Sequence, residues 1–246
     1  MNYIIFDLEF NQKHPDNKDL ASPDLTFEII QIGAVKLDNK FNKIATFNKF
    51  IKPTVFSTIH PYVEELTNIT IDMVTSCDTF PEVFNDFLKF IGSDKYTLIV
   101  WGTGDLRELF RNMKFHKIPF SHLQAKYIDI QSYASSYFNY PKGNKIGLKT
   151  AIDLLSITIE KDFHDAFNDA FYTSKVFESL YNKKMKAKLY SLPEKKNHTH
   201  ANKKLDINAL LSLFDKIYNR PMNNEEKEII RLAYMMGRTQ QFIKNN

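Results

Sequence analysis

Two acidic residues, Asp7 and Glu9, stand two positions apart at the end of an apolar stretch near the start of the chain. Side chains at positions i and i+2 of a β-strand point to the same face of a sheet. Two carboxylates on one face of a mostly apolar strand repel each other and resist burial, and a divalent cation removes both penalties. The pair therefore indicates metal binding, while an exposed edge strand is an alternative that the pair alone leaves open.

A third acid, Asp105, follows the apolar residues 98–101 and a turn that contains two glycines, and it precedes a helical pattern. An aspartate in this place is often a helix N-cap. The same position, at the carboxyl end of a buried strand, is also where α/β proteins place their ligands. Both interpretations of Asp105 stay open from this segment alone.

A histidine and a further aspartate, His164 and Asp169, lie at the expected start of a late helix over residues 165–182. About one helical turn separates them, so the imidazole is expected on a similar side to the carboxylate. This is the layout of a general base beside a metal ligand. The alternatives are a surface histidine, Asp165 as a helix cap and Asp169 on a solvated face, and this short segment does not decide between them.

The elements that must position these residues are predicted from hydrophobic periodicity and from turn-forming residues. Strands are expected over residues 3–10, 28–37, 44–51, 97–101 and 127–130. Helices are expected in several short pieces between residues 61 and 91, from residue 105 onwards, and over residues 131–138, 148–155 and 165–182. Three strands, a helical stretch and then alternating strands and helices indicate an α/β sheet with helices packed on it.

Taken together and in this order, the motifs resemble those of the DEDD exonucleases, in the branch that has a catalytic histidine. That family has Asp-x-Glu on its first strand, an Asp after a later strand and His-x-Ala-x-x-Asp on a late helix. The matching segments here are Asp7-Leu8-Glu9, Asp105 and His164-Asp165-Ala166-Phe167-Asn168-Asp169. Shorter matches are Ile30-Gln31-Ile32-Gly33-Ala34-Val35, Leu66-Thr67-Asn68-Ile69-Thr70 and Gly147-Leu148-Lys149.

Two departures from the family pattern accompany these matches. Asn68 stands where the family has Gly, which is a mild change because Asn tolerates positive φ. Phe10 stands where many members have Thr, and members that act on RNA ends, together with a sporulation-inhibitor-like bacterial group, are more varied at this position. The resemblance covers residues 1–182 and is closest to this group.

The resemblance implies a ribonuclease H-like α/β fold: a mixed five-stranded sheet with helices on both faces. It implies a 3′–5′ exonuclease that hydrolyses phosphodiester bonds at the 3′ end of single-stranded nucleic acid, with RNA favoured over DNA, and releases nucleoside 5′-monophosphates. In the family's two-metal mechanism, two Mg²⁺ or Mn²⁺ ions bracket the scissile phosphate. The implied metal ligands are Asp7, Glu9, Asp105 and Asp169, with Asp7 bridging both ions, and His164 is the implied general base.

Four residues near these motifs are candidates for substrate binding: Phe10, Leu66, Thr67 and Trp101. Phe10, Leu66 and Trp101 have apolar or aromatic side chains that are suited to wedging or stacking terminal bases. Packing in the core is the alternative for these three. Two rival functions also remain open at this stage: a proofreading-type DNA exonuclease subunit, and a nucleic-acid-binding scaffold that has lost activity.

Charge is distributed unevenly along the 246 residues. Residues 1–182 contain 19 Lys and Arg against 23 Asp and Glu, whereas residues 183–246 contain 14 against 6. Eight of the lysines lie in residues 183–204 beside the single acid Glu194, which predicts a basic linker that is either merely solvated or attracts a phosphate-rich partner. Residues 205–246 contain two amphipathic helical patterns, too small to form a core alone. They are expected to be a helical hairpin appendage that docks on the exonuclease domain or on a protein partner.

The single cysteine, Cys77, excludes an internal disulfide and a thiolate zinc site. It is expected to fill a small apolar space in a reducing, intracellular setting. The first residues have no basic segment of the kind that begins a secretory signal, and no run of about 18 apolar residues is present. A cytoplasmic protein without a membrane segment is therefore expected.

Overall fold

The computed structural model describes residues 1–13, 25–141, 143–160, 162–191 and 207–238. Contacts divide the chain into two compact units, Met1–Leu192 and Pro193–Asn246. Residues 183–191, which were expected to begin the basic linker, therefore belong with the first unit. The boundary expected at residue 182 differs from this division by ten positions.

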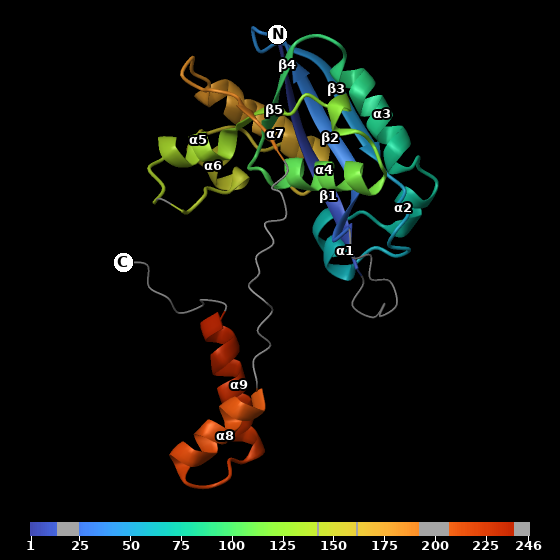
Figure 1. Cartoon of the computed structure of the whole chain (residues 1–246). Coiled ribbons are helices and arrows are strands. Elements are labelled where there is room, and N and C mark those ends of the chain that lie inside the picture. Colours follow the sequence, from blue (N-terminus) through green and yellow to red (C-terminus); the bar gives the residue numbers. More distant parts are fainter. Residues whose placement is uncertain (14–24, 142, 161, 192–206, 239–246) are drawn as a thin grey trace. The chain divides into compact units, whose positions relative to one another are not determined.

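The first unit contains a six-stranded mixed sheet with the strand order β3-β2-β1-β4-β5-β6 (Figure 1). The strands are β1 (Asn2–Gln12), β2 (Phe27–Leu37), β3 (Lys43–Phe50), β4 (Tyr96–Val100), β5 (Lys126–Asp129) and β6 (Lys188–Leu189). The first three strands are antiparallel to one another, β4 and β5 run parallel to β1, and β6 is antiparallel to β5. All five expected strands are present. The sheet has one strand more than expected, because β6 was not predicted: its two exposed residues have no apolar alternation.

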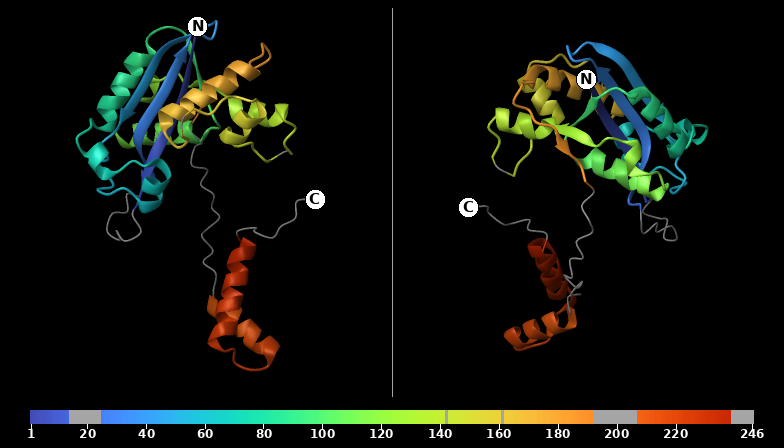
Figure 2. Two further views of the ribbon diagram at one scale, coloured as in Figure 1. Left: turned by 180° about the vertical axis from the view of Figure 1, so that it is seen from behind. Right: turned by 45° about the horizontal axis from the view of Figure 1, so that its top comes forward.

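Helices cover both faces of this sheet, as expected (Figure 1 and Figure 2). They are α1 (Pro61–Thr67), α2 (Ile71–Thr75), α3 (Phe80–Ile91), α4 (Gly104–Phe115), α5 (Ile130–Tyr137), α6 (Leu148–Leu154) and α7 (Ala166–Leu180), with a 3-10 turn at Phe120–His122. The alternation of β1 divides the core between the faces. Ile4, Phe6 and Leu8 pack with α3 and α4, whereas Tyr3 and Ile5 pack with α5, α6 and α7.

Two helix starts differ slightly from expectation, and both matter for the candidate site. Helix α4 begins at Gly104 with Thr103 as its N-cap, so Asp105 lies in the first turn and is not the cap. Helix α7 begins at Ala166, because the side chain of Asp165 caps it by accepting a hydrogen bond from the backbone N–H of Asn168. Asn68 ends α1 with φ of 58°, the left-handed conformation that its place in the motif predicts.

The second unit contains the two expected helices, α8 (Ile207–Tyr218) and α9 (Asn224–Arg238). Asn223 caps α9, since its side chain accepts from the backbone N–H of Glu226 at 2.9 Å and the Glu226 carboxylate accepts from the backbone N–H of Asn223. Met222, between the helices, is only 4% exposed. Docking of this unit on the first one or on a partner stays a prediction. Among the described residues, no helix is both long and apolar enough to cross a membrane.

Candidate active site

The two acids of the first motif lie on β1 and face α7. They continue the odd-numbered positions of the strand, whose side chains Tyr3 and Ile5 pack on the α7 side of the sheet. Glu9 is only 9% exposed, and Asp7 is half-buried. The sequence prediction that both carboxylates share one face is therefore confirmed, and that face is covered by a helix, so this is not an exposed edge strand.

A glycine on the neighbouring strand brings α7 against this part of the sheet. Gly33 on β2 is the register partner of Asp7. A Cβ atom built on Gly33 would lie 2.1 Å from the carbonyl carbon of Ala166, the first residue of α7. Since no side chain fits in that space, only glycine allows the start of α7 to approach β2 so closely. This approach places the first turn of α7, with Asp169, beside Asp7.

Gln31 on β2 fastens the start of the same helix and is completely buried. Its Nε2 donates to the Asp165 carboxylate at 2.8 Å, and its Oε1 accepts from the backbone N–H of Ala166 at 3.2 Å. Sequence reasoning matched this residue to a family segment without seeing its function. The available signal was a lone amide side chain between the apolar residues Ile30 and Ile32, since a buried amide must find hydrogen-bond partners.

Three carboxylates converge at this point, from Asp7, Glu9 and Asp169. One oxygen of each lies within 4.8 Å of the others. Asp169 Oδ2 accepts from the backbone N–H of His164 at 3.2 Å, while the buried Oδ1 of Asp169 has no hydrogen-bond partner within the described part of the chain. A buried carboxylate oxygen without a donor needs another source of positive charge. These oxygens fit a divalent cation, because hard cations such as Mg²⁺ and Mn²⁺ prefer oxygen ligands.

Asp105 lies outside this three-carboxylate set but is close enough to act on it electrostatically. Burial raises the pKa of Asp7 well above its usual range, and repulsion from Asp105, Asp169 and Glu9 adds to the rise. Burial and the same kind of repulsion raise the pKa of Glu9 to about 8. Burial and repulsion from Asp169 raise the pKa of Asp105 to about 7. The four acids therefore cannot all ionise easily unless a cation joins them.

His164 lies at the edge of this cluster, directly before the Asp165 cap. It is exposed, and its φ of 65° places it in the left-handed region that few non-glycine residues adopt. Burial raises the pKa of Asp169 to about 6, and both the His164 N–H group and the charge of its imidazole oppose that rise. The structure thus brings together all five residues of the three motifs: Asp7, Glu9, Asp105, His164 and Asp169.

The two aromatic candidates for substrate binding are both half-buried. Phe10 follows a register shift between β1 and β2, and its ring lies 6.2 Å from that of Phe27. Trp101 follows the end of β4 and packs against the core on the α7 side. Its buried Nε1 has no hydrogen-bond partner within the described ranges. Packing in the core is observed for both rings, and contact with substrate stays a prediction.

The other two candidates, Leu66 and Thr67, lie in the last turn of α1 and are half-buried. Thr67 Oγ1 donates to the carbonyl of Val63 at 2.8 Å and accepts from the backbone N–H of Ile69 at 3.1 Å. These bonds help to close the turn after α1. Thr67 therefore has a local structural function, and substrate binding by either residue stays a prediction.

Comparison with known families decides what this arrangement belongs to. A family model described as exonuclease, of the RNase_T type, matches residues 4–177. The chain belongs to this exonuclease family. The resemblance predicted from the three motifs is therefore confirmed.

The relatives of this exonuclease-family chain include enzymes named for RNA and for DNA. It is 26% identical to human 3′-5′ exoribonuclease 1 over 49% of this chain and 37% of that protein. It is 27% identical to the probable 3′-5′ exonuclease KapD of Bacillus subtilis over 71% of this chain and 82% of that protein. It is 30% identical to DNA polymerase III subunit epsilon of Treponema pallidum over 62% of this chain and 67% of that protein. The chain spans little more than a third of the human relative and 12% of the PolC-type DNA polymerase III of Clostridium perfringens.

Solved structures of exonucleases have the same fold. The nuclease domain of 3′hExo, described as a DEDDh family member bound to rAMP, matches with a TM-score of 0.65 at 18% identity, over 78% of this chain and 97% of that one. Escherichia coli Exonuclease I in complex with a dT13 oligonucleotide matches with a TM-score of 0.56 at 18% identity, over 73% of this chain and 41% of that one. The expected ribonuclease H-like α/β fold is therefore confirmed, apart from the extra strand β6.

Proposed function

We propose that the first unit is a divalent-metal-dependent 3′–5′ exonuclease that acts on the 3′ end of single-stranded nucleic acid and releases nucleoside 5′-monophosphates. One observation carries this proposal. Within a unit of the exonuclease family, the carboxylates of Asp7, Glu9 and Asp169 converge within 4.8 Å, and one buried oxygen of Asp169 has no partner among the described residues. Such an arrangement is unfavourable without a cation and favourable with one.

Each residue of the site has a proposed role that follows from its place. Asp7, Glu9 and Asp169 would hold one divalent cation, and Asp105, whose charge acts on Asp7 and Glu9, would support a second. Bound Mg²⁺ or Mn²⁺ supplies a Lewis acid that eases deprotonation of water and stabilises charge on the phosphate. His164, beside Asp169 and open to solvent, accepts the proton of the attacking water. Gln31 orients the helix that carries Asp169 and takes no part in the chemistry.

We favour RNA over DNA as the substrate, because one relative and one solved structure are described by their action on or binding of RNA components. The human relative is a 3′-5′ exoribonuclease, and the 3′hExo nuclease domain was solved with rAMP. The proofreading-type alternative has support of its own, because relatives include DNA polymerase III subunit epsilon and PolC-type polymerases. In that alternative, α8 and α9 are the segment that binds a polymerase. An inactive scaffold is disfavoured because all five residues of the motifs are present.

One experiment tests class and substrate together. Single-stranded RNA and DNA of one sequence, labelled at the 5′ end, are incubated with the full chain in Mg²⁺, in Mn²⁺ or in EDTA. The expected result is a ladder that shortens from the 3′ end only with metal, and faster on RNA. Shortening in EDTA, or cleavage at internal positions only, contradicts the proposal.

The matched variants for this experiment are Asp7→Asn and Asp153→Asn, the second in an exposed position on α6. Asp7→Asn should abolish turnover, and it should leave the metal-free protein as stable as before or more stable, because it removes a repelling charge. Asp153→Asn should leave turnover unchanged. If Asp7→Asn keeps more than about a few per cent of the activity, Asp7 does not hold the ions, since losing such a charge–metal contact costs several kcal/mol.

A further inference from the structure

Helix α4 connects the carboxylate cluster to a row of exposed cations. Asp105 lies in its first turn, and Arg107, Arg111 and Lys114 follow at spacings of four and three residues. Residues at these spacings share one face of a helix. All three are exposed, while Leu106, Leu109 and Met113 on the opposite face are buried in the core. Because the charge of Arg107 acts on the Asp105 carboxyl group, this line of cations begins near the proposed active site and leads away from it along α4.

The first two cations are held in place by a buried acid. Glu108 is only 3% exposed, and its Oε1 accepts from Arg107 Nε and from Arg111 Nη1, both at 2.8 Å. The two arginine side chains remain 48% and 44% exposed. Each of these bonds uses one nitrogen of a guanidinium that has five N–H donors. Glu108 thus orients both guanidinium groups while leaving further donors at the surface.

The inner face of α4 is fastened to the sheet, so that the row is presented on a rigid support. Asn112 is completely buried. Its Oδ1 accepts from the backbone N–H of Ile29 at 3.2 Å, and its Nδ2 donates to the carbonyl of Phe27 at 3.0 Å. Both partners belong to β2, the strand that also contains Gly33 and Gln31. The position of the cations is therefore coupled to the strand that positions Asp169.

After Glu108, which pairs with both arginines, the sequence has no acidic residue until Asp129. Residues 109–128 contain Arg111, Lys114, Lys117 and Lys126 and not one Asp or Glu. This contrasts with residues 1–182 as a whole, in which acids outnumber Lys and Arg. A local cluster of one sign raises the concentration of oppositely charged ligands near it. Residues 109–128 therefore have the charge expected of a surface that binds a polyanion.

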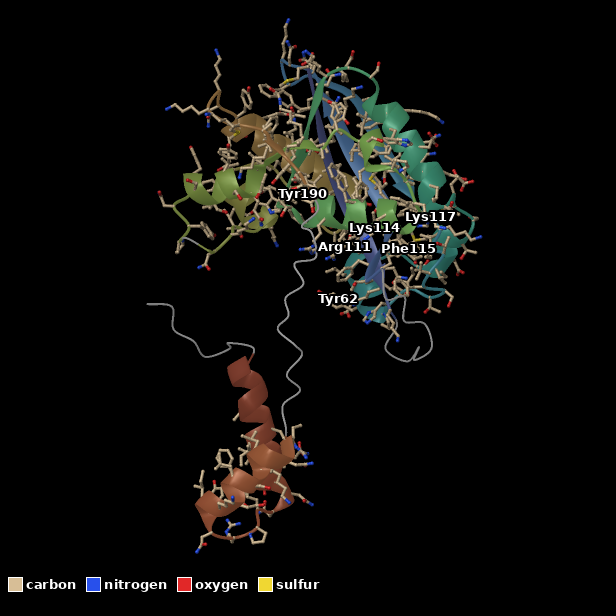
Figure 3. The ribbon with its side chains drawn as sticks, viewed as in Figure 1. Tyr62, Arg111, Lys114, Phe115, Lys117 and Tyr190 are labelled. Atoms are coloured by element: carbon tan, nitrogen blue, oxygen red, sulfur yellow. The ribbon has the colours of Figure 1, made fainter. Side chains whose placement is uncertain are left out.

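Aromatic rings accompany these cations, as Figure 3 shows for Tyr190 and Phe115. The ring of Tyr190 lies 5.2 Å from that of Phe110 on α4. Burial raises the pKa of the Tyr190 hydroxyl, and the nearby guanidinium groups of Arg107 and Arg111 oppose the rise. Cations interleaved with aromatic rings are typical of surfaces that bind single-stranded nucleic acid. This combination favours nucleic acid over an acidic protein surface.

We propose that Arg107, Arg111, Lys114 and Tyr190, here called the α4 track, bind the sugar–phosphate backbone on the 5′ side of the bond that is cleaved. The proposal rests on the exonuclease function proposed above and names the surface that holds the rest of the strand. At a rise of about 1.5 Å per residue, the three cations span roughly 10 Å, which matches about three nucleotides of a stacked strand. A dinucleotide reaches the metal site but not the far end of the α4 track.

The test compares two double variants of the full chain that change net charge equally. Arg111→Gln with Lys114→Gln removes two cations of the α4 track. Lys40→Gln with Lys43→Gln removes two exposed lysines at the opposite end of the sheet, since Lys43 pairs with Leu37 and Leu37 pairs with Tyr3. Binding of a labelled 12-nucleotide single-stranded RNA is measured by fluorescence anisotropy in EDTA across a salt series. Turnover of the same RNA and of a dinucleotide is measured in Mg²⁺.

The expected result is specific to the α4 track. Two lost phosphate contacts should flatten the slope of log K against log salt by about 1.4 and weaken binding at low salt about tenfold. The KM for the 12-nucleotide RNA should rise with kcat unchanged, while dinucleotide cleavage should stay as in the unsubstituted protein. The Lys40/Lys43 pair should show none of these effects. Lys114→Gln alone leaves both Glu108 ion pairs intact, and it should flatten the slope by about 0.7.

The proposal is overturned if the α4 track variants match the Lys40/Lys43 pair in slope and in KM, in which case this basic face serves another class of partner. Lys114→Gln decides the question if loss of Arg111 prevents folding. Failure of the exonuclease function itself is distinguishable. It would appear as no metal-dependent shortening by the unsubstituted chain, whereas the comparison in EDTA depends only on binding.

Discussion

The carboxyl groups of the candidate site are buried close together and repel one another, which is unfavourable for the folded protein. Glu9 is nearly buried in the sheet, close to Asp7 and Asp169, and its pKa is raised to about 8 by burial and by these neighbours. Removing water from several acids in one place is costly unless protons or cations compensate. At neutral pH, protons compensate only in part. The metal-free protein should therefore be less stable than the metal-bound protein.

This cost predicts a dependence of stability on pH. A carboxyl group whose pKa is higher in the folded than in the unfolded protein binds more protons when folded, so stability falls as pH rises through the folded pKa. The stabilisation associated with Glu9 is fully present below the ordinary glutamate pKa of 4.5 and is lost as pH rises through the folded pKa of about 8. In EDTA, the free energy of unfolding should therefore drop by on the order of 1 kcal/mol between pH 7 and pH 9.

Urea denaturation in EDTA at the two pH values measures this drop. The interval avoids His116, whose pKa is lowered by burial and which therefore titrates at lower pH with the opposite effect on stability. Glu9→Gln is the matched control and should reduce the dependence, to which Asp7 and Asp105 also contribute because their pKa values are raised. Mg²⁺ at pH 9 should restore stability by binding the folded state. Equal stability at pH 7 and pH 9 without metal would show that Glu9 is ionised throughout.

His164 permits a cleaner substitution than alanine, because its backbone has a φ of 65°. Asn tolerates this conformation, so His164→Asn should keep the backbone N–H bond to Asp169 while removing the imidazole. As a general base, His164 should contribute roughly 10²–10⁴-fold to turnover. The variant should lose kcat to this extent and bind RNA in EDTA as before. An unchanged kcat would mean that His164 is only a surface residue.

At the scale of elements, the sequence patterns located most strands and helices, because apolar periodicity reports which face of an element is buried. The sequence patterns did not predict the contacts between elements. Gly33 is an ordinary glycine in the sequence, and only its Cβ position relative to Ala166 shows that it determines where α7 lies. Gln31 likewise acquires its function from Asp165, which is 134 residues away. The short strand β6 was missed because two exposed residues leave no periodic signal.

The contact between β2 and α7 predicts a strong effect of Gly33→Ala. The new methyl group would overlap the backbone at the start of α7, which cannot rotate away as a flexible side chain can. Overpacking of this kind typically costs about 1–3 kcal/mol. The helix should be pushed outward, so that Asp169 separates from Asp7. Turnover should therefore fall more than stability alone explains, and higher concentrations of Mn²⁺ should be needed for half-maximal activity.

Gly104→Ala is the matched control, because nothing lies within 4 Å of the Cβ position of Gly104 at the start of α4. This variant should be neutral, or stabilised by up to about 1 kcal/mol through higher helix propensity. Thermal denaturation and metal titrations of both variants make the comparison. If Gly33→Ala folds and needs the same metal concentration as the unsubstituted protein, the close approach to Ala166 is not needed to position Asp169.

At the scale of the whole molecule, the division into two units changes how the basic tail must be tested. Residues 183–191 belong to the first unit, where β6 pairs with β5 and the Tyr190 ring packs on Phe110. A truncation after Asn182 would remove these contacts and part of the α4 track. The remaining lysines of the segment first expected to be the linker are Lys195, Lys196, Lys203 and Lys204, which lie outside the described residues. Their contribution to binding stays a prediction from charge.

That contribution can be separated from the contribution of α8 and α9 with two proteins. One is the chain ending at Ser191, and the other is the full chain with Lys195, Lys196, Lys203 and Lys204 all changed to Gln. If the lysines attract the strand, three or four lost contacts should flatten the salt slope by about two to three units in both proteins. The KM for long RNA should rise in both, sequence preference should not change, and dinucleotide cleavage should stay nearly the same, because lysine–phosphate contacts carry little sequence information.

Thermal denaturation first confirms that the shortened chain is folded. A flattened slope in the truncated protein alone would assign the effect to α8 and α9, and unaltered slopes in both would leave residues 193–204 as a solvated connection between the units.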